Sequence, residues 1–401
     1  MKSGKIIVRG ILLSAALVLT VGCSNDEVEE TRRESVPVEL SAYVSDYTEI
    51  EPMSPVATRA DNSWIPSGYK PYTELTGVGG VMRTNENAPI AAFFTQDAIG
   101  SDPSVLLPRK FSFAVDKWRI REEEVPASGP TTPYQLYGYI PYTAATPYND
   151  SGDGSTIEPN DTYADGAKLT LRGLNSVMNQ DVCVIVGAKE GASTTEVTGL
   201  QTGKFSCVIQ SGENVSNNVF LLFDHLYAAL RFRFRVDEDY AKLRTIKLKR
   251  LELMAYDDED CTIKVKKKVK TTVTLKANET NSSPIVGDII FEPDGNDVML
   301  PVAIYDNETN PVVLPSGNSY TDNMGFVPKT ESYYKLISTY DVYDMNNNLI
   351  RQNCTAENKI SPRSLFQKQS LDRGYMYTLR LTVKPTYIYV LSEPDLVFST
   401  E

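Results

Sequence analysis

Histidine and cysteine, the side chains that most often perform catalysis or hold metals, are scarce in this sequence. Its 401 residues contain one histidine, His225, within the apolar stretch LLFDHLYAALRF. Zinc hydrolases generally use two or more imidazoles, and a Ser–His–Asp triad needs its imidazole beside a nucleophile. The sequence has no nucleophile-elbow, P-loop, dinucleotide-binding or EF-hand pattern. We therefore expect His225 to be a structural residue.

The other candidate groups are carboxylates and thiols. Carboxylate pairs hydrolyse glycosides, but none of the 52 acidic residues can be paired from the sequence, so we predict no catalytic residue and no cofactor. Beyond residue 23, the cysteines follow one another at intervals of 24, 54 and 93 residues. Without a CxxC motif a metal site is not expected, and disulfide pairing stays open. These cysteines are Cys183, which stands in the apolar stretch VCVIVGA, Cys207, Cys261 and Cys354.

The N-terminal residues have the pattern of an export signal that ends at a cysteine. Three basic residues precede the apolar run ILLSAALVLT at 11–20. About ten apolar residues suit a secretory signal, whereas a membrane-spanning helix needs about 20. Gly22 and Cys23 follow, which resembles the lipobox of bacterial lipoproteins, although Thr20 stands where leucine is commoner. The resemblance implies a signal peptide at 1–22 and a lipid on Cys23 that anchors the protein in the outer membrane.

The residues after Cys23 are acidic. The stretch SNDEVEE has four carboxylates, a density that favours a solvated tether, which we place at 23–34. This acidic patch resembles the signal that, in certain Gram-negative anaerobes, sends lipoproteins to the outer face of the outer membrane. The formal charge of the chain is −12, or about −15 without the signal. Because an acidic surface repels phosphate backbones, we expect no nucleic-acid partner.

Strand patterns dominate the rest of the chain. Alternation of apolar and polar residues, which marks a strand with one buried face, occurs in SVPVELSAYV at 35–44, KFSFAV at 110–115, ALRFRFRV at 229–236 and YMYTLRLTV at 375–383. In RTIKLKRLELMA the apolar residues change parity between Leu248 and Leu251, which predicts a β-bulge near Lys249 and Arg250. The inward residues of the first stretch are predicted to be Val36, Val38, Leu40, Ala42 and Val44.

The basic run IKVKKKVKTTVTLK at 263–276 has two interpretations. It could bind a polyanion, or it could form a long strand with a solvated lysine face that protects a sheet edge. We favour the strand, because its odd positions are mostly apolar while its even positions are lysine or threonine.

Short strands separated by Gly-, Asn-, Asp- and Pro-rich turns predict an all-β fold of β-sandwiches. No long amphipathic helix is expected, and RSLFQKQSL is predicted to form one short helical turn. After a signal of 22 residues, 379 remain, which suggests two domains, with three as the alternative. The patterning weakens at QSGENVSNN, so we place the domains at 35–214 and 215–401.

Three motifs stand out besides the lipoprotein start: ATRA at 57–60, YGYIPY at 137–142 and FDHLYAALRFRFRV at 223–236. Together they resemble the fimbrillins, the subunits of type V pili, and their Mfa-like or fimbrillin-like relatives. The resemblance implies two tandem transthyretin-like β-sandwich domains. It also implies a non-enzymatic structural or accessory subunit of a pilus, or fimbria, that mediates adhesion.

The family's assembly mechanism assigns roles to particular residues. In fimbrillins an arginine-specific protease removes the first strand, and a strand from a neighbouring subunit, self or sister, replaces it. The matching bond here joins Arg59 to Ala60, with Arg32 and Arg33 as competing sites. The displaced strand would be 36–44, and its loss would cost on the order of ten kcal/mol of apolar burial energy. Matching alternation makes the C-terminal strands candidate donors, through Leu379, Leu381, Val383, Ile388 and Val390.

Two other functions remain open from the sequence. The protein could stay monomeric as a surface lipoprotein that binds glycans or a host ligand, and tyrosines in loop-rich regions could then stack on sugars. The candidates are Tyr69, Tyr72, Tyr134, Tyr137, Tyr139 and Tyr142. A carbohydrate-active enzyme is the third and weakest hypothesis, since no carboxylate pair stands out. The sequence does not decide between stalk, tip and anchor positions.

Overall fold

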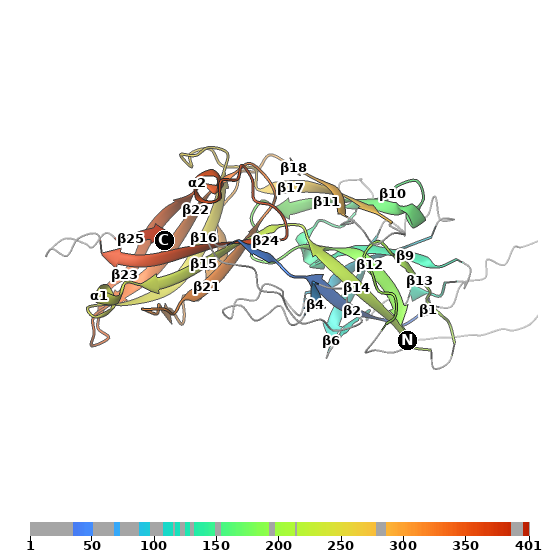
Figure 1. Cartoon of the computed structure of the whole chain (residues 1–401), viewed down its shortest axis with the longest axis horizontal. Helices are drawn as coiled ribbons and strands as arrows, with labels where there is room; N and C mark the ends of the chain where they lie inside the picture. The colour runs from blue at the N-terminus through green and yellow to red at the C-terminus, as the bar shows by residue number, and fades with distance from the viewer. Residues whose placement is uncertain are drawn as a thin grey trace, which may run out of the picture. The chain divides into compact units, whose positions relative to one another are not determined.

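In the computed structural model of Figure 1, the strands of the described residues form five β-sheets. The structure describes residues 35–50, 68–72, 88–96, 107–114, 117–120, 125–128, 132–148, 154–191, 197–212, 215–277, 286–385 and 396–400. Among these residues, α-helix is limited to α1 (Glu238–Ala241) and α2 (Pro362–Phe366), the second of which confirms the predicted helical turn. No helix in the described ranges is long and apolar enough to cross a membrane. The described residues form part of one compact unit, Glu34–Glu401.

The largest sheet has nine strands and closes on itself. Its order is β12-β14-β2-β7-β6-β5-β9-β13, β4 pairs with β2, and β9 also pairs with β12. Closure leaves fewer unpaired strand edges. The strands are β2 (Val38–Ser45), β4 (Tyr69–Pro71), β5 (Ile90–Thr95), β6 (Arg109–Ala114), β7 (Lys117–Arg119), β9 (Tyr134–Ile140), β12 (Cys183–Gly191), β13 (Ser206–Cys207) and β14 (Asn217–His225).

Two smaller sheets accompany it. One has the order β10-β11-β17-β18, and the other pairs β1 with β8. Tyr142–Ala144 and Tyr163–Asp165 form short 3-10 helices. The strands are β1 (Ser35–Val36), β8 (Val125–Pro126), β10 (Thr156–Pro159), β11 (Gly166–Asn175), β17 (Lys268–Lys276) and β18 (Val286–Pro293).

Two five-stranded sheets contain most of the strands of the C-terminal half, together with β3. In the first, β21-β15-β24-β25 follow one another and β3 pairs with β24; in the second, β19-β16-β22-β23 follow one another and β20 pairs with β16. Their strands are β3 (Thr48–Ile50), β15 (Ala228–Val236), β16 (Thr245–Tyr256), β19 (Val302–Asp306), β20 (Val312–Val313), β21 (Thr321–Val327), β22 (Tyr333–Tyr343), β23 (Leu349–Ile360), β24 (Tyr375–Pro385) and β25 (Leu396–Thr400).

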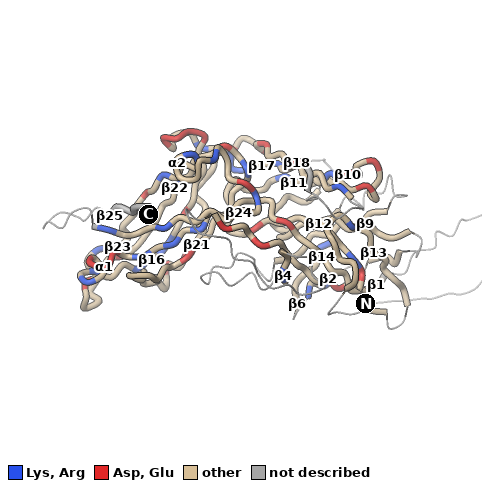
Figure 2. Tube along the Cα trace, viewed as in Figure 1, with Lys and Arg blue, Asp and Glu red and all other residues tan. Residues whose placement is uncertain are grey.

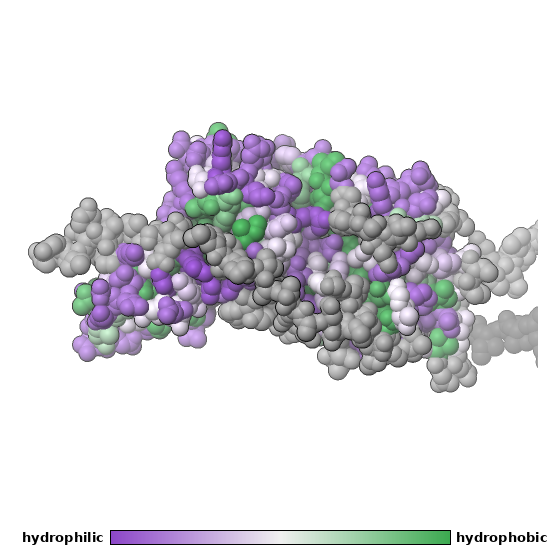
Figure 3. Space-filling model, in the orientation of Figure 1, coloured by the Kyte–Doolittle hydropathy of each residue, from purple (hydrophilic) through white to green (hydrophobic). Residues whose placement is uncertain are grey.

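The buried apolar residues form two large clusters. The first cluster contains the buried apolar residues of β2, β5, β9, β12 and β14, and the second contains most of those of β15, β16, β22 and β24. The predicted domain boundary at 214 stays a prediction; in the structure the strand that follows it, β14, lies in the nine-stranded sheet. On the face shown in Figure 3, hydrophobic side chains form small patches within a mostly hydrophilic surface.

Strand β15 confirms the alternation predicted at 229–236. Leu230, Phe232 and Phe234 are fully buried in the second cluster. The arginines between them are not simply solvated, because Arg231 is only 7% exposed and contacts Asp322. On the polar face of this strand, Arg231 and Arg233 therefore both have the carboxylate of Asp322 as a partner.

The basic run forms a strand, as predicted, but at a different place in its sheet. β17 covers only 268–276, and Val269, Val273 and Leu275 are buried along it. It pairs with β11 on one side and β18 on the other, so the predicted edge position is wrong. Figure 2 shows acidic and basic residues interspersed along the described chain. Lys270, for example, pairs with Glu292 at 2.5 Å.

The predicted β-bulge is confirmed, and it buries a lysine. The register of β16 against β22 shifts between Leu248 and Arg250. Lys249 is consequently turned inward and is 8% exposed. Its Nζ donates to Asn353 Oδ1 at 2.7 Å and lies 3.8 Å from Asp341 Oδ2. Asp341, itself 4% exposed, also accepts from the Asn353 backbone amide.

Removing this lysine is expected to destabilise the second cluster. Lys249→Ala leaves Asp341 as a buried charge without its cation, and breaking a buried ion pair in this way costs about 3–5 kcal/mol of unfolding free energy. Lys247→Ala is the matched control, because Lys247 bonds an exposed Asn347 and lies over the Tyr343 ring. Its expected cost is at most about 1 kcal/mol. Urea unfolding of both variants measures the difference, and equal costs would contradict the assignment.

Candidate functional site

Strand β2 lies inside the nine-stranded sheet rather than at its edge. It pairs in parallel with β14, from Val38↔Asn217 to Val44↔Phe223. On its other side it pairs with β7 and β4 in antiparallel register. We call the edges of β14, β7 and β4 that face β2, together with the buried side chains against which β2 packs, the β2 site. In Figure 1, β2 is the blue strand beside β14.

The inward residues of this segment match the sequence prediction. Their exposed fractions are Val36 6%, Val38 1%, Leu40 0%, Ala42 5% and Val44 0%. They share the first cluster with the large side chains of Trp118, Phe220 and Phe223. Losing β2 would therefore expose apolar surface and also free a row of backbone N–H and C=O groups on β14.

Polar contacts secure the opposite face of β2. Glu39 Oε1 accepts from Arg119 Nε at 2.7 Å, and Glu39 Oε2 lies 3.8 Å from the buried Lys117 Nζ. Just before the strand, Asn217 Nδ2 donates to the Pro37 carbonyl at 3.3 Å. Just after it, Lys70 forms an ion pair with Asp46. Both ends of the segment are thus fixed by side chains from elsewhere in the chain.

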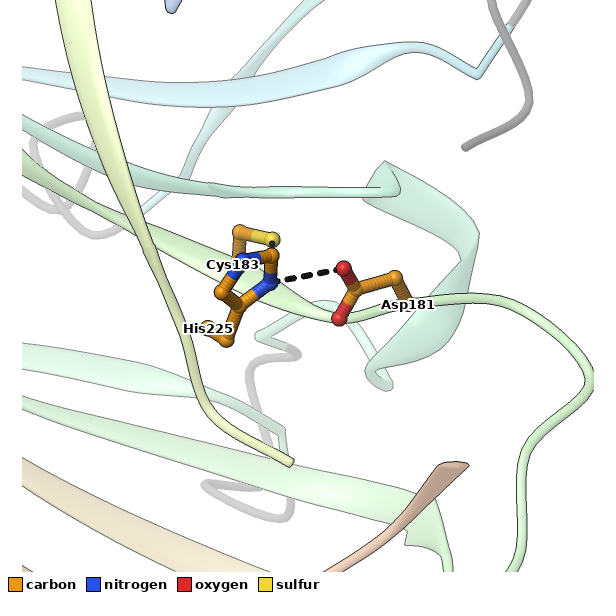
Figure 4. Close-up of side chains that lie close together, drawn as sticks. All are labelled: Asp181, Cys183 and His225. Atoms are coloured by element: carbon orange, nitrogen blue, oxygen red, sulfur yellow. Dashed lines mark hydrogen bonds and ion pairs between the residues drawn. The ribbon is translucent and has the colours of Figure 1, made fainter. Parts of the chain in front are cut away.

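A buried polar cluster holds the residues that follow β2. Figure 4 shows Asp181, Cys183 and His225 side by side. Asp181 Oδ2 lies 2.7 Å from His225 Nδ1, and Asp181 Oδ1 accepts from the Tyr47 hydroxyl at 2.8 Å. His225 Nε2 lies 2.6 Å from the Ser45 carbonyl oxygen. Because a carbonyl oxygen can only accept, Nε2 carries a hydrogen.

These residues have the types of metal ligands, but their contacts are those of a hydrogen-bond network. One ligand atom from each of Asp181, Cys183 and His225 lies within 4.8 Å of the others. However, both Asp181 oxygens already have partners, Tyr47 and His225. Burial and the neighbouring Asp181 raise the pKa of the Cys183 thiol, which disfavours the thiolate that a metal would require. In this structure His225 is a member of that hydrogen-bond network.

The segment continues from the first cluster to the second. After Tyr47, strand β3 pairs in parallel with β24, from Thr48↔Tyr375 to Ile50↔Tyr377. Glu49 Oε1 lies 3.4 Å from Arg231 Nη1 on β15. The 35–50 segment therefore contributes one strand to each of three sheets, through β1, β2 and β3, which the sequence did not predict.

The remaining predicted site residues fall in two groups. Cys23, Arg59, Ala60, Ile388 and Val390 lie outside the described residues. Three predicted donor residues lie in β24, which is paired with β15 and belongs to the chain's own second cluster: Leu379, Leu381 and Val383 are 4%, 2% and 0% exposed. If β24 were donated to another copy, the second cluster would lose these buried side chains, so we do not propose these three as donor residues.

The predicted tyrosine stacking surface is wrong for four of its six residues. Tyr134, Tyr137 and Tyr139 lie within β9 rather than in loops, and they are at most 5% exposed, while Tyr72 is 1% exposed. Their rings fill the first cluster, as Tyr72 does in its edge contact with Trp118 at 5.7 Å between centroids. Only the half-buried Tyr69 and Tyr142 remain, and Tyr69 donates to Asp224 at 2.6 Å.

The four cysteines within the described residues are buried thiols. Burial raises the pKa of Cys207, and likewise that of Cys261. They are small buried side chains, as expected for Cys183, and no disulfide joins them in this structure.

Sequence reasoning missed Asp181 and Tyr47. Their side chains meet although 134 positions separate them. Asp181 stands in NQDVCV, where a polar residue before a buried strand looks like an ordinary turn residue. The one available signal was His225, because a buried histidine needs polar partners that must come from somewhere in the fold.

No family model matches the chain, and no curated protein matches it. Solved structures do match. A fimbrial protein from Bacteroides vulgatus is 14% identical over 78% of this chain and 92% of its own, with a TM-score of 0.32. A fimbrial protein from Bacteroides ovatus is 11% identical over 87% of this chain and 48% of its own, at 0.29. The fimbrial anchor protein Mfa2 from Porphyromonas gingivalis is 11% identical over 90% and 98%, at 0.20. All three TM-scores are below 0.5 and all three identities are below 15%.

Proposed function

We propose that this protein is a structural or accessory subunit of a cell-surface pilus that is assembled by strand replacement. The precursor reaches the outer membrane as a lipoprotein anchored through Cys23, and its two clusters correspond to tandem transthyretin-like β-sandwich domains. Cleavage after Arg59 releases the segment that contains β2, and a strand from another subunit then occupies the β2 site. The protein acts by assembly and adhesion rather than by catalysis.

The observation that supports this proposal best is the position of β2. Five apolar side chains of one N-terminal segment are buried in the first cluster, and the strand is hydrogen-bonded on both sides. At ~1–3 kcal/mol for each buried aliphatic side chain, loss of this segment costs on the order of ten kcal/mol of apolar burial energy. An opened site of this kind binds an extended strand by β-augmentation. Since donor and acceptor lie on different parts of the chain, the contact extends into a filament.

The donor is best sought after Pro385. The tail sequence TYIYVL alternates in the required way, with Ile388 and Val390 on one face. In the structure, β25 pairs with β24 at the end of its sheet's strand order. A strand at a sheet edge has one neighbouring strand and can leave without separating two others. β24 lies between β15 and β25 and cannot leave in this way.

Digestion with an arginine-specific protease tests the proposal. The mature wild-type chain is expected to lose its N-terminal segment and to form polymers visible by size-exclusion chromatography and electron microscopy. Arg59→Ala should stay uncut at this bond and remain monomeric. The control, Arg32→Ala with Arg33→Ala, should polymerise like the wild type. A chain that is cut after Arg59 and stays monomeric at high concentration would contradict strand replacement and favour a monomeric ligand-binding lipoprotein.

A further inference from the structure

The two C-terminal five-stranded sheets meet at one end, where several of their strands begin or finish. The Leu314 amide donates to the Ile246 carbonyl near the start of β16, and the next residue, Pro315, accepts from the Val236 amide at the end of β15. Because β15 pairs in parallel with β24, β24 also finishes at this end, at Pro385. In Figure 1 this end is marked by α1, which connects β15 to β16.

Large apolar side chains are exposed at the same end. The last residue of β22, Tyr343, pairs here with Thr245, and the turn to β23 follows. Val313 pairs with Lys247, whose Nζ donates to Asn347 in that turn at 2.9 Å. Scattered exposed apolar residues are ordinary, but several that gather at one end mark an interaction surface. We call the following residues, given with their exposed fractions, the apolar end patch: Leu243 52%, Val313 53%, Met345 59%, Leu349 49% and Ile350 49%.

The proposed donor strand is joined to the chain at this end. It follows Pro385, and Ile388 and Val390 stand three and five positions further along. An extended chain advances by at most ~3.6 Å per residue, so in a donor strand these two residues lie within about 11 and 18 Å of Pro385. A copy that receives them in its β2 site must therefore come up against the end of the molecule that carries the apolar end patch.

We propose that the apolar end patch is the surface on which the receiving copy of this chain packs when the donor strand enters its β2 site. This inference rests on the proposed strand replacement and adds a second contact to it. A few half-exposed side chains offer much less area than a stable interface buries, so the patch alone does not join two uncut chains. Once the donor strand is bound, it holds the two copies at a high effective concentration, and the weak apolar contact then forms.

The rate of polymerisation after cleavage tests this proposal. The double variant Met345→Glu/Leu349→Glu places two carboxylates on the apolar end patch. Both side chains reach water in the monomer, so the fold of the uncut chain and its cleavage after Arg59 should be unchanged. Packing of the receiving copy against these charges would desolvate them. We therefore expect the initial rate of polymer formation, followed by light scattering, to fall at least about 10-fold.

Leu300→Glu is the matched control and should polymerise like the wild type. Leu300 is 58% exposed and precedes β19, which pairs with the other end of β16 at Leu253↔Val302.

The outcomes separate this inference from the proposed function. If the double variant polymerises at the wild-type rate, or if Leu300→Glu slows polymerisation equally, the role of the patch is refuted while strand replacement stands. If the cut wild type stays monomeric, strand replacement itself fails. Should the double variant not fold, hydrogen exchange of the wild type decides: the amides of residues 344–350 should exchange more slowly in the polymer than in the uncut monomer, and equal rates would refute the contact.

Discussion

Replacing Leu40 by aspartate is expected to expel the N-terminal segment from the β2 site. Leu40 is fully buried and lies opposite Val219 on one side and Trp118 on the other. A carboxylate there would have no cation within an apolar cluster, and the leucine's own burial energy would also be lost. We expect the unfolding free energy to fall by about 4 kcal/mol or more. Urea unfolding measures this loss, and limited proteolysis of the segment detects its release.

The matched control is the same substitution at the next residue. Ser41 lies on the opposite, half-buried face of β2, so Ser41→Asp places the charge where it can reach water. Its expected cost is below about 1 kcal/mol. If Leu40→Asp kept the segment as resistant to proteolysis as Ser41→Asp does, the apolar contacts of β2 would not be what retains it.

The second large effect is expected in the second cluster, at Asp322. This buried carboxylate accepts from two arginines of β15: Arg231 Nη2 at 2.5 Å and Arg233 Nε at 3.1 Å. Asp322→Ala leaves Arg231, which is 7% exposed, facing only the half-exposed Glu49. Removing one partner of a buried ion pair costs about 3–5 kcal/mol. The midpoint of urea unfolding should fall accordingly.

An exposed acid provides the comparison for Asp322. Asp239 is bonded to Lys242 at 2.7 Å, and this contact lowers its pKa. Both side chains are solvent-exposed, so Asp239→Ala should change the unfolding free energy only slightly. Similar midpoints for the two alanine variants would show that the arginines of β15 do not depend on Asp322.

Local patterns predicted those features that depend on neighbouring residues alone. Alternation located the buried faces of β2 and β15, because side chains of a strand alternate whatever its partners are. The parity change at Lys249 located the bulge for the same reason. The side chains with which the 35–44 segment fills the β2 site were therefore predictable from ten consecutive positions.

Features that depend on distant pairing were not predictable. The parallel pairing of β2 with β14 joins Val38 to Asn217, and nothing in either stretch specifies the other. The interior position of β17 depends on β11 and β18, and the burial of the β9 tyrosines depends on the sheet around them. The Tyr47–Asp181 contact is of the same kind. Periodicity shows which face of a strand is buried but not what covers it.

Hydrogen exchange at residues 217–223 of β14, followed by mass spectrometry, tests the central claim most directly. The β14 amides that bond to β2 should exchange slowly in the intact chain, rapidly after cleavage and loss of the N-terminal segment, and slowly again in the assembled polymer. If these amides stay protected after the segment has left, or stay unprotected in the polymer, then no strand replaces β2 and the proposed mechanism of assembly is wrong.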